Sequence, residues 1–119
     1  MTHSYNPWTV DAADLEAKPL APPSAEPLSG QIMTRSKVEF ANDERTIISG
    51  TWESDPGTSR WEFLTRAEII HLLEGSMTVQ RDGEDAVTLS PGSVAYFPLG
   101  WTGVWTVTEP VRKFYVVYK

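Results

Sequence analysis

The sequence has no cysteine and only two histidines among its 119 residues. Without cysteine, the chain can form no disulfide framework, thiolate nucleophile or thiolate metal site. The scarcity of histidine also leaves Ser76, Ser90 and Ser93 without a neighbour placed to activate them as nucleophiles. Disulfide scaffolds and nucleophilic hydrolase schemes are therefore not supported.

Long apolar runs and clusters of positive charge are absent as well. No run approaches the roughly 20 apolar residues that cross a bilayer, and the N-terminus lacks the basic start and apolar centre of a signal peptide. The net charge is −6, and the ten lysines and arginines are dispersed along the chain. Nucleic acid and anionic membranes are therefore not expected as partners, and we expect a soluble cytoplasmic protein.

Proline is concentrated near the N-terminus, where residues 1–30 hold five of the nine prolines. Because proline fixes φ and removes a backbone donor, the stretch AKPLAPPSAEPLSG cannot form a helix or a central strand. We expect residues 1–30 to form an extended arm and residues 31–119 to form the domain. The apolar residues of the arm are Trp8, Val10, Leu15, Leu20 and Leu28. The segment is either a partly ordered tail or an arm that wraps a partner subunit.

The rest of the chain is a succession of short segments rich in β-branched and aromatic residues. Turn signals such as Asp-Pro-Gly, Asp-Gly-Glu-Asp, Ser-Pro-Gly and Pro-Leu-Gly separate these segments, and none shows sustained helical periodicity. About nine strands in about 90 residues are typical of an all-β sandwich or barrel that protects its edges by rolling up. A chain of this length is expected to form one domain with one core.

From residue 46 onward, one acidic residue and several turn residues fall at distinctive spacings. The residues concerned are Gly57, Glu68 and Gly75, followed by Gly92, Pro98 and Gly100. Six residues separate Glu68 from Gly75, and five separate Gly92 from Pro98. This pattern resembles the two sequence motifs of the cupins. The resemblance implies an RmlC-like cupin jelly-roll β-barrel over residues 31–119, preceded by the Pro-rich arm.

The same alignment places other residues where cupins carry their metal ligands. The two histidines of the first motif correspond to Trp61 and Phe63, the histidine of the second motif to Gly103, and its asparagine to Val107. Of the four usual ligands only Glu68 remains, and a single carboxylate does not hold a divalent metal tightly. We therefore expect no bound metal and no other cofactor.

His71 does not replace the missing ligands. It stands three residues after Glu68 on the same expected strand, so its side chain points to the opposite face. We interpret His71 as a surface or packed histidine.

Within the cupins, the sequence is similar to the ureidoglycine aminohydrolase-type and ethanolamine-utilisation-type members. The stretches SGTWESDPGTSRW and FPLGWTGVWTVTEPVRKFYV carry this similarity. The ureidoglycine enzyme has two cupin halves and a metal, whereas this chain has neither a second cupin nor the ligands. The resemblance therefore implies a fold and leaves the reaction, and whether there is one, open.

In the cupin register, strand alternation directs Glu68 and four aromatic side chains into the barrel. We expect Lys113, in the last strand, to be the cation that pairs with Glu68. The expected aromatic walls of the pocket are Trp61, Phe63, Phe97 and Trp105. In such a pocket Glu68 and Lys113 would orient a small polar metabolite, in particular a nitrogenous one. In an enzyme, Glu68 would act as the general acid or base.

Two functional alternatives remain open at this point. The Glu68–Lys113 pair either recognises a ligand or closes a filled barrel, and in the second case the chain is a non-catalytic structural or dimerisation module. An open cavity of roughly a few hundred cubic ångströms would favour ligand binding. Both alternatives are compatible with a homodimer, which the edges of a small sheet and the apolar arm favour.

Overall fold

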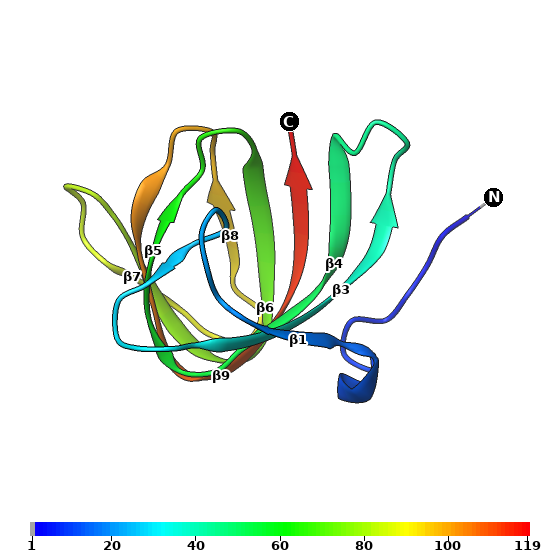
Figure 1. The fold of residues 1–119 in the computed structure, drawn as a ribbon, viewed down its shortest axis with the longest axis horizontal. Coiled ribbons are helices and arrows are strands. Elements are labelled where there is room, and N and C mark those ends of the chain that lie inside the picture. The colour runs from blue at the N-terminus through cyan, green and yellow to red at the C-terminus, as the bar shows by residue number, and fades with distance from the viewer. Residues whose placement is uncertain (1) are drawn as a thin grey trace.

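Two long strands, β6 (Ala67–Arg81) and β9 (Thr102–Tyr118), run antiparallel through the centre of the fold (Figure 1). The computed structural model describes residues 2–119, and seven shorter strands accompany this pair. They are β1 (Glu16–Pro19), β2 (Glu26–Pro27), β3 (Met33–Ala41), β4 (Ile47–Ser54), β5 (Gly57–Glu62), β7 (Val87–Leu89) and β8 (Val94–Phe97). The single helical element of the described chain is a 3₁₀ turn, η1 (Ala12–Asp14).

The shorter strands divide between the two halves of the long pair. β8 pairs with the first half of β6 and β7 with the second half, while β5 pairs with the first half of β9 and β4 with the second half. Each long strand therefore belongs to both walls of a sheet that curls on itself, as in a jelly roll. The predicted all-β fold is confirmed.

A bulge between Leu72 and Met77 bends β6 where the two walls meet. Gly75 lies in this bulge with a φ of +83°, and a β-carbon at this position would clash with the carbonyl oxygen of Pro110 on β9. Pro110 has no register partner in β6, so its missing N–H removes no ladder bond there. The segments EIIHLLEG and SMTVQRDG, which meet after Gly75, predict two separate strands. The structure joins them into one bent strand because pairing with β9 resumes beyond the bulge.

The Pro-rich segment supplies both edges of the main strand order. In the order β1-β3-β4-β9-β5-β2, the two outermost strands come from residues before Gly30. Pro19 and Pro27 lie in these edge strands, where a missing N–H is tolerated. Between the two strands, Leu20 and Ala25 are buried in the hydrophobic core. The segment therefore packs against its own domain.

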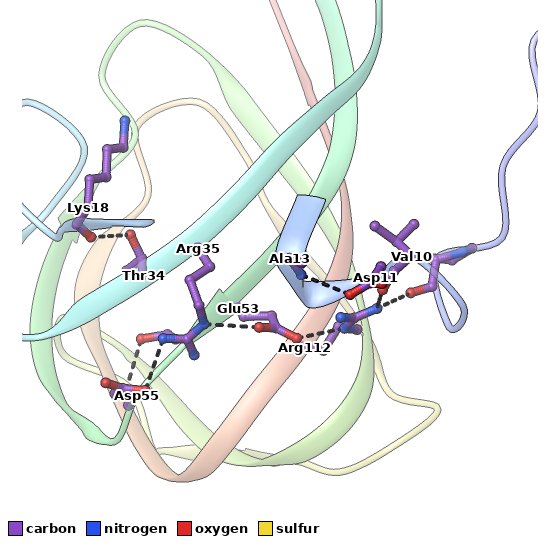
Figure 2. Close-up of polar contacts among 11 residues, drawn as sticks. Val10, Asp11, Ala13, Lys18, Thr34, Arg35, Glu53, Asp55 and Arg112 are labelled. Atoms are coloured by element: carbon purple, nitrogen blue, oxygen red, sulfur yellow. Dashed lines mark hydrogen bonds and ion pairs between the residues drawn. The ribbon is translucent and has the colours of Figure 1, made fainter. Parts of the chain in front are cut away.

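Residues 5–10, which precede η1, lie against the outer face of the sheet. Arg112 of β9 donates hydrogen bonds to the carbonyl oxygens of Pro7 and Val10, at 3.0 and 2.7 Å. Glu53 of β4 accepts a hydrogen bond from Arg112 at 2.8 Å and another from Arg35 of β3 at 3.0 Å. Figure 2 shows Glu53 lying between the two arginines. One carboxylate thus orients two arginines, and Arg112 fastens the N-terminal segment to the domain.

The core lies between the two walls and is rich in aromatic side chains. Its largest members are Trp61, Phe63, Phe97, Trp101 and Trp105. Each is less than a tenth exposed. Strand alternation directs Trp61, Phe97 and Trp105 inward, while Phe63 and Trp101 directly adjoin the ends of β5 and β9. No helix within residues 2–119 is long and apolar enough to cross a membrane.

Candidate functional site

An ion pair between Glu68 and Lys113 lies inside the barrel. Glu68 is on β6, and its register partner on β9 is Val117. Lys113 stands four residues before Val117, so the side chains of Lys113 and Val117 point to the same inward face of β9. The long lysine side chain reaches along the strand towards Glu68. The Lys113 Nζ atom is 2.7 Å from Glu68 Oε2, and the two side chains are 2% and 6% exposed. The structure therefore brings together the two charges that the sequence placed in the pocket.

Aromatic rings surround the Lys113 ammonium group. Its Nζ atom lies 4.4 Å from the ring centroid of Trp52 and 4.5 Å from that of Trp105. Trp52 is placed there by register, because it is the β4 partner of Lys113. Rings at this distance stabilise a cation through their quadrupoles. Burial nevertheless lowers the pKa of Lys113, and the neighbouring Glu68 carboxylate opposes that effect.

Tyr115 follows on the same inward face of β9. Its ring centroid is 5.9 Å from Lys113 Nζ. Burial, assisted by the negative charge of Glu68, raises the pKa of Tyr115 to about 12. The phenol is therefore neutral beside the ion pair, and its hydroxyl can both donate and accept a hydrogen bond.

Two stacked aromatic pairs form the interior below the ion pair. Trp61 stacks on Trp105 with centroids 3.9 Å apart, and Phe63 stacks on Phe97 with centroids 5.3 Å apart. Phe97 and Trp105 are each 1% exposed and belong to the packed core. They do not line either of the two cavities described next.

A cavity of about 340 Å³ opens beside the ion pair. The barrel contributes both charged residues, Glu68 and Lys113, and the rings of Trp52, Trp61 and Tyr115. The segment from residue 18 to residue 24 contributes the opposite side. The cavity thus has an aromatic wall, a buried pair of charges and a cover made by the Pro-rich segment.

A second cavity of about 350 Å³ lies on the other side of that cover. Pro23 and Ser24 line both cavities, and so do Trp61 and Glu68. Phe63 lines only the second. The loop carrying Pro23 and Ser24 therefore divides the space above Glu68 into two compartments.

The positions that carry metal ligands in cupins do not form a metal site here. Trp61 and Phe63 are stacked together, with centroids 5.9 Å apart. At Gly103 there is no room for a side chain, since a β-carbon would clash with the backbone carbonyl of Gln80 and lie 2.6 Å from the Trp101 ring. Within residues 2–119, no group of three or more histidine, aspartate or glutamate side chains could hold a metal ion. The residues present do not fit a cupin metal centre.

His71 points away from the site. It follows Ile70, which is fully buried, and its ring meets that of Trp8 edge-on at 5.7 Å on the outer face. The packed histidine expected from strand alternation is what the structure shows. His3 lies beside Phe40, with ring centroids 5.2 Å apart, and contributes nothing to the interior.

Sequence reasoning did not assign Trp52, Tyr115 or the cover segment to the pocket. Trp52 and Tyr115 follow from alternation once Lys113 is known to point inward, because one is its strand partner and the other lies two residues on. The cover segment has no comparable signal. Its place depends on the pairing of β1 with β3 and of β2 with β5, which proline content does not encode.

The curled two-walled sheet, with its cavity beside Glu68, defines the chain as a cupin. Residues 41–115 match the model of the EutQ-like cupin domain, so the chain belongs to that family. No curated protein matches the chain in sequence.

Solved structures place the fold among the same proteins. The EutQ protein of Clostridium difficile is 26% identical, with a TM-score of 0.62 over 73% of this chain and 63% of that one. A protein of unknown function from Pseudomonas syringae is also 26% identical, with a TM-score of 0.73 over 87% of this chain and 43% of that one. This chain therefore spans less than two thirds of either relative.

More distant structures share the fold alone. KdgF from Halomonas is 15% identical, with a TM-score of 0.62 over 71% of this chain and 79% of that one. Proteins as different as EutQ and KdgF thus use this barrel, so the fold does not define a reaction. The jelly-roll cupin fold that the two motifs predicted is confirmed.

Proposed function

We propose that this cupin binds a small polar molecule in the 340 Å³ cavity beside Glu68 and Lys113. The observation that carries the proposal is an almost fully buried ion pair in the wall of an open cavity. Burying two charges is costly, and a pair that only fills space is often replaceable by apolar side chains without loss of stability. A ligand that uses both charges gives the pair a function.

The free hydrogen-bonding capacity of the pair indicates the chemistry of the ligand. An ammonium group has three donors, and within residues 2–119 the Lys113 ammonium donates only to Glu68 Oε2. Glu68 Oε1 accepts no hydrogen bond from the described chain. The pair therefore offers a donor and an acceptor side by side. Amides, ureides and amino acids present the complementary combination, and their apolar parts would contact Trp52 and Trp61.

A catalytic role would fall to Glu68. Its carboxylate contacts Lys113 at 2.7 Å and lines both cavities, so it can reach a bound molecule from either side of the cover. A positioned carboxyl group can act as general acid or base. The proposed chemistry is proton transfer by the chain's own residues, because the positions that carry cupin metal ligands hold Trp61, Phe63 and Gly103.

The alternative function is a non-catalytic module, and the packed interior favours it. The stacks of Trp61 on Trp105 and of Phe63 on Phe97 leave the lower part of the barrel filled. In that case the cavity would be a consequence of packing, and no small molecule would stabilise the protein.

A thermal-shift screen against ureides, amino acids, small carboxylates and amines tests the proposal. A ligand that binds only the folded state raises the melting temperature by about 10 °C when its concentration is a hundredfold above its Kd. We expect a stabilising compound in this set. Trp52→Ala should abolish its effect, because Trp52 lines the cavity.

Trp8→Ala is the matched control, since Trp8 is 54% exposed on the outer face. This variant should respond to the compound as the unmodified protein does. The proposal is wrong if no compound in the set stabilises the protein, or if stabilisation survives in Trp52→Ala.

A further inference from the structure

Lys113 differs from the other three lysines of the chain in its surroundings. Lys18, Lys37 and Lys119 are exposed, whereas the Lys113 side chain is 2% exposed. Its amino group lies between aromatic rings, touches one carboxylate, and stands in the wall of the cavity. Ligand binding by a cation alone would not require this degree of enclosure, because an exposed lysine also provides a charge.

We propose that Lys113 is a nucleophile that forms an imine with a small aldehyde or ketone bound in the cavity, with Glu68 as the proton-transfer group. This inference rests on the proposed function, because it requires that the cavity admits small molecules. It specifies the class of ligand as a carbonyl compound and the mode of binding as covalent and reversible.

The surroundings of Lys113 favour the neutral amine that such chemistry needs. An amine attacks a carbonyl carbon only when its lone pair is free, and removal from water favours loss of the proton. Burial lowers the pKa of Lys113, which acts in this direction. Glu68 Oε2, at 2.7 Å, is in position to accept the proton directly.

The step balances without any further reactant. Glu68 takes one proton from the ammonium group of Lys113, and the freed lone pair forms a C–N bond to the carbonyl carbon. The carbonyl oxygen receives this proton from Glu68 and becomes a hydroxyl group. Glu68 then removes a second proton from nitrogen and delivers it to the hydroxyl, which leaves as water as the C=N bond forms. The products are a protonated imine, one water molecule and the regenerated Glu68 carboxylate.

The cavity restricts which carbonyl compounds can react. Its volume of about 340 Å³ equals roughly ten water-sized volumes of about 30 Å³ each, so it admits small carbonyl compounds beside the cover segment. Trp52 and Trp61 offer ring faces to an apolar substituent, while Thr34 and Ser36 line the cavity with hydroxyl-bearing side chains. Short aldehydes and small oxo acids suit these dimensions and contacts.

Reductive trapping of the unmodified protein tests the proposal. The protein is incubated with propionaldehyde, glyoxylate or pyruvate, treated with sodium cyanoborohydride, digested and mapped by mass spectrometry. We expect modification at Lys113 to exceed that at each exposed lysine by about tenfold or more for at least one compound. Lys18, which also borders the cavity, is the internal control for mere proximity.

Glu68→Gln tests the role of the carboxylate. This change retains the shape of the side chain but removes proton transfer, so trapping at Lys113 should slow by roughly a hundredfold. Circular dichroism establishes that the variant is folded. Lys113→Arg retains a cation but cannot form an imine, so its adduct should disappear while labelling of Lys18, Lys37 and Lys119 is unchanged.

The outcomes separate this inference from the proposed function. Trapping at Lys113 no faster than at the exposed lysines overturns the imine, and so does a trapping rate that Glu68→Gln leaves unchanged. If a compound of the thermal-shift screen still stabilises the protein and Trp52→Ala abolishes that effect, non-covalent ligand binding survives without the imine. If no compound stabilises and none is trapped, both proposals fail.

Discussion

The environment of Lys113 combines two opposing effects on one charge. Enclosure by Trp52 and Trp105 removes water from the ammonium group, and this lowers its pKa. The Glu68 carboxylate at 2.7 Å favours the charged form. Removing either partner would leave the other buried and unpaired. This mutual dependence can be measured at the level of single residues.

A double-mutant cycle measures the coupling between Glu68 and Lys113. Glu68→Gln and Lys113→Met should each lower the free energy of unfolding by about 1 to 4 kcal/mol, because each leaves a buried charge without its partner. The double variant should lose less than the sum of the two. Urea denaturation followed by tryptophan fluorescence provides the measurement. Additive losses would contradict the pairing seen in the structure.

Tyr115 should make the protein less stable at alkaline pH. Its pKa in the folded state is about 12, above the ordinary value of 10.0, so the unfolded state loses the phenolic proton first. The contribution of Tyr115 is therefore complete below pH 10 and is lost as the pH rises from 10 towards 12. The loss amounts to about 1.4 kcal/mol per pH unit at most.

Tyr115→Phe provides the matched comparison for this effect. Lys113 is present in both proteins, so its own titration cancels in the difference between their stabilities. We expect the difference in free energy of unfolding to change above pH 10 in the direction that favours the phenylalanine variant. A constant difference between pH 9 and pH 12 would show that the Tyr115 phenol is not shielded.

We also predict that the purified protein contains no stoichiometric zinc, manganese or iron. The motif positions that supply ligands in cupins hold Trp61, Phe63 and Gly103, and Gly103 has no room for a larger side chain. Elemental analysis of protein prepared without a histidine tag measures this directly. One equivalent of any of these metals per chain would refute the prediction.

At the scale of elements, the bent strands β6 and β9 determine the shape of the site. The sequence predicted the strands on both sides of Gly75 correctly, because their β-branched and aromatic content is a local property. It did not predict their continuity. The bulge depends on the approach of Pro110 on β9 to Gly75, a contact between residues far apart in the chain.

The Pro-rich segment shows the same limit. Proline content excluded a helix and a central strand, in agreement with the edge positions of β1 and β2. It contained no information on where the segment lies. The burial of Leu20 and Ala25 and the position of Pro23 and Ser24 over the cavity follow only from strand pairing with β3 and β5.

Leu20 should anchor this segment over the cavity. Leu20→Ala should lower the free energy of unfolding by about 2 to 4 kcal/mol, because Leu20 is 7% exposed and packs in the core. Leu28→Ala is the matched control in the same segment, since Leu28 is 52% exposed and its loss should cost less than about 0.5 kcal/mol. Equal losses in the two variants would show that the segment does not pack as described.

At the scale of the whole molecule, the motifs accounted for much of the candidate site. They fixed the register around Glu68 and Phe97, but they do not extend into the last strand, so the inward position of Lys113 follows only from the pairing of β9 with β4 and β6. The motifs could not distinguish residues that line the cavity from residues of the packed core. Phe97 and Trp105 also point inward, but they lie in the packed core. That distinction depends on how far along the barrel axis a side chain lies. Strand alternation indicates only whether the side chain points inward or outward.

An apolar patch on the outer face bears on the assembly of the molecule. Ile69 of β6 is the register partner of Tyr96 on β8, and Val94 lies two residues before Tyr96 on the same face. These three side chains are 36%, 55% and 67% exposed, respectively. The Tyr96 hydroxyl accepts a hydrogen bond from the hydroxyl of Tyr118 at 3.0 Å, which extends the surface onto β9. Contiguous exposed apolar surface of this kind is typical of interaction sites.

We predict that the protein is a homodimer in which this patch is buried. A two-fold axis would bring the same surface of two chains together, and the dispersed charges of the chain present no obstacle at an apolar patch. Light scattering at micromolar concentration should give about twice the chain mass of 13.3 kDa.

Val94→Glu should weaken the dimer by about a hundredfold, because it places a carboxylate in an apolar contact. Val87→Glu changes a valine that is 55% exposed on β7, outside the patch, and should leave the dimer intact. A monomer at this concentration, or equal effects of the two substitutions, would show that the patch is not the dimer interface.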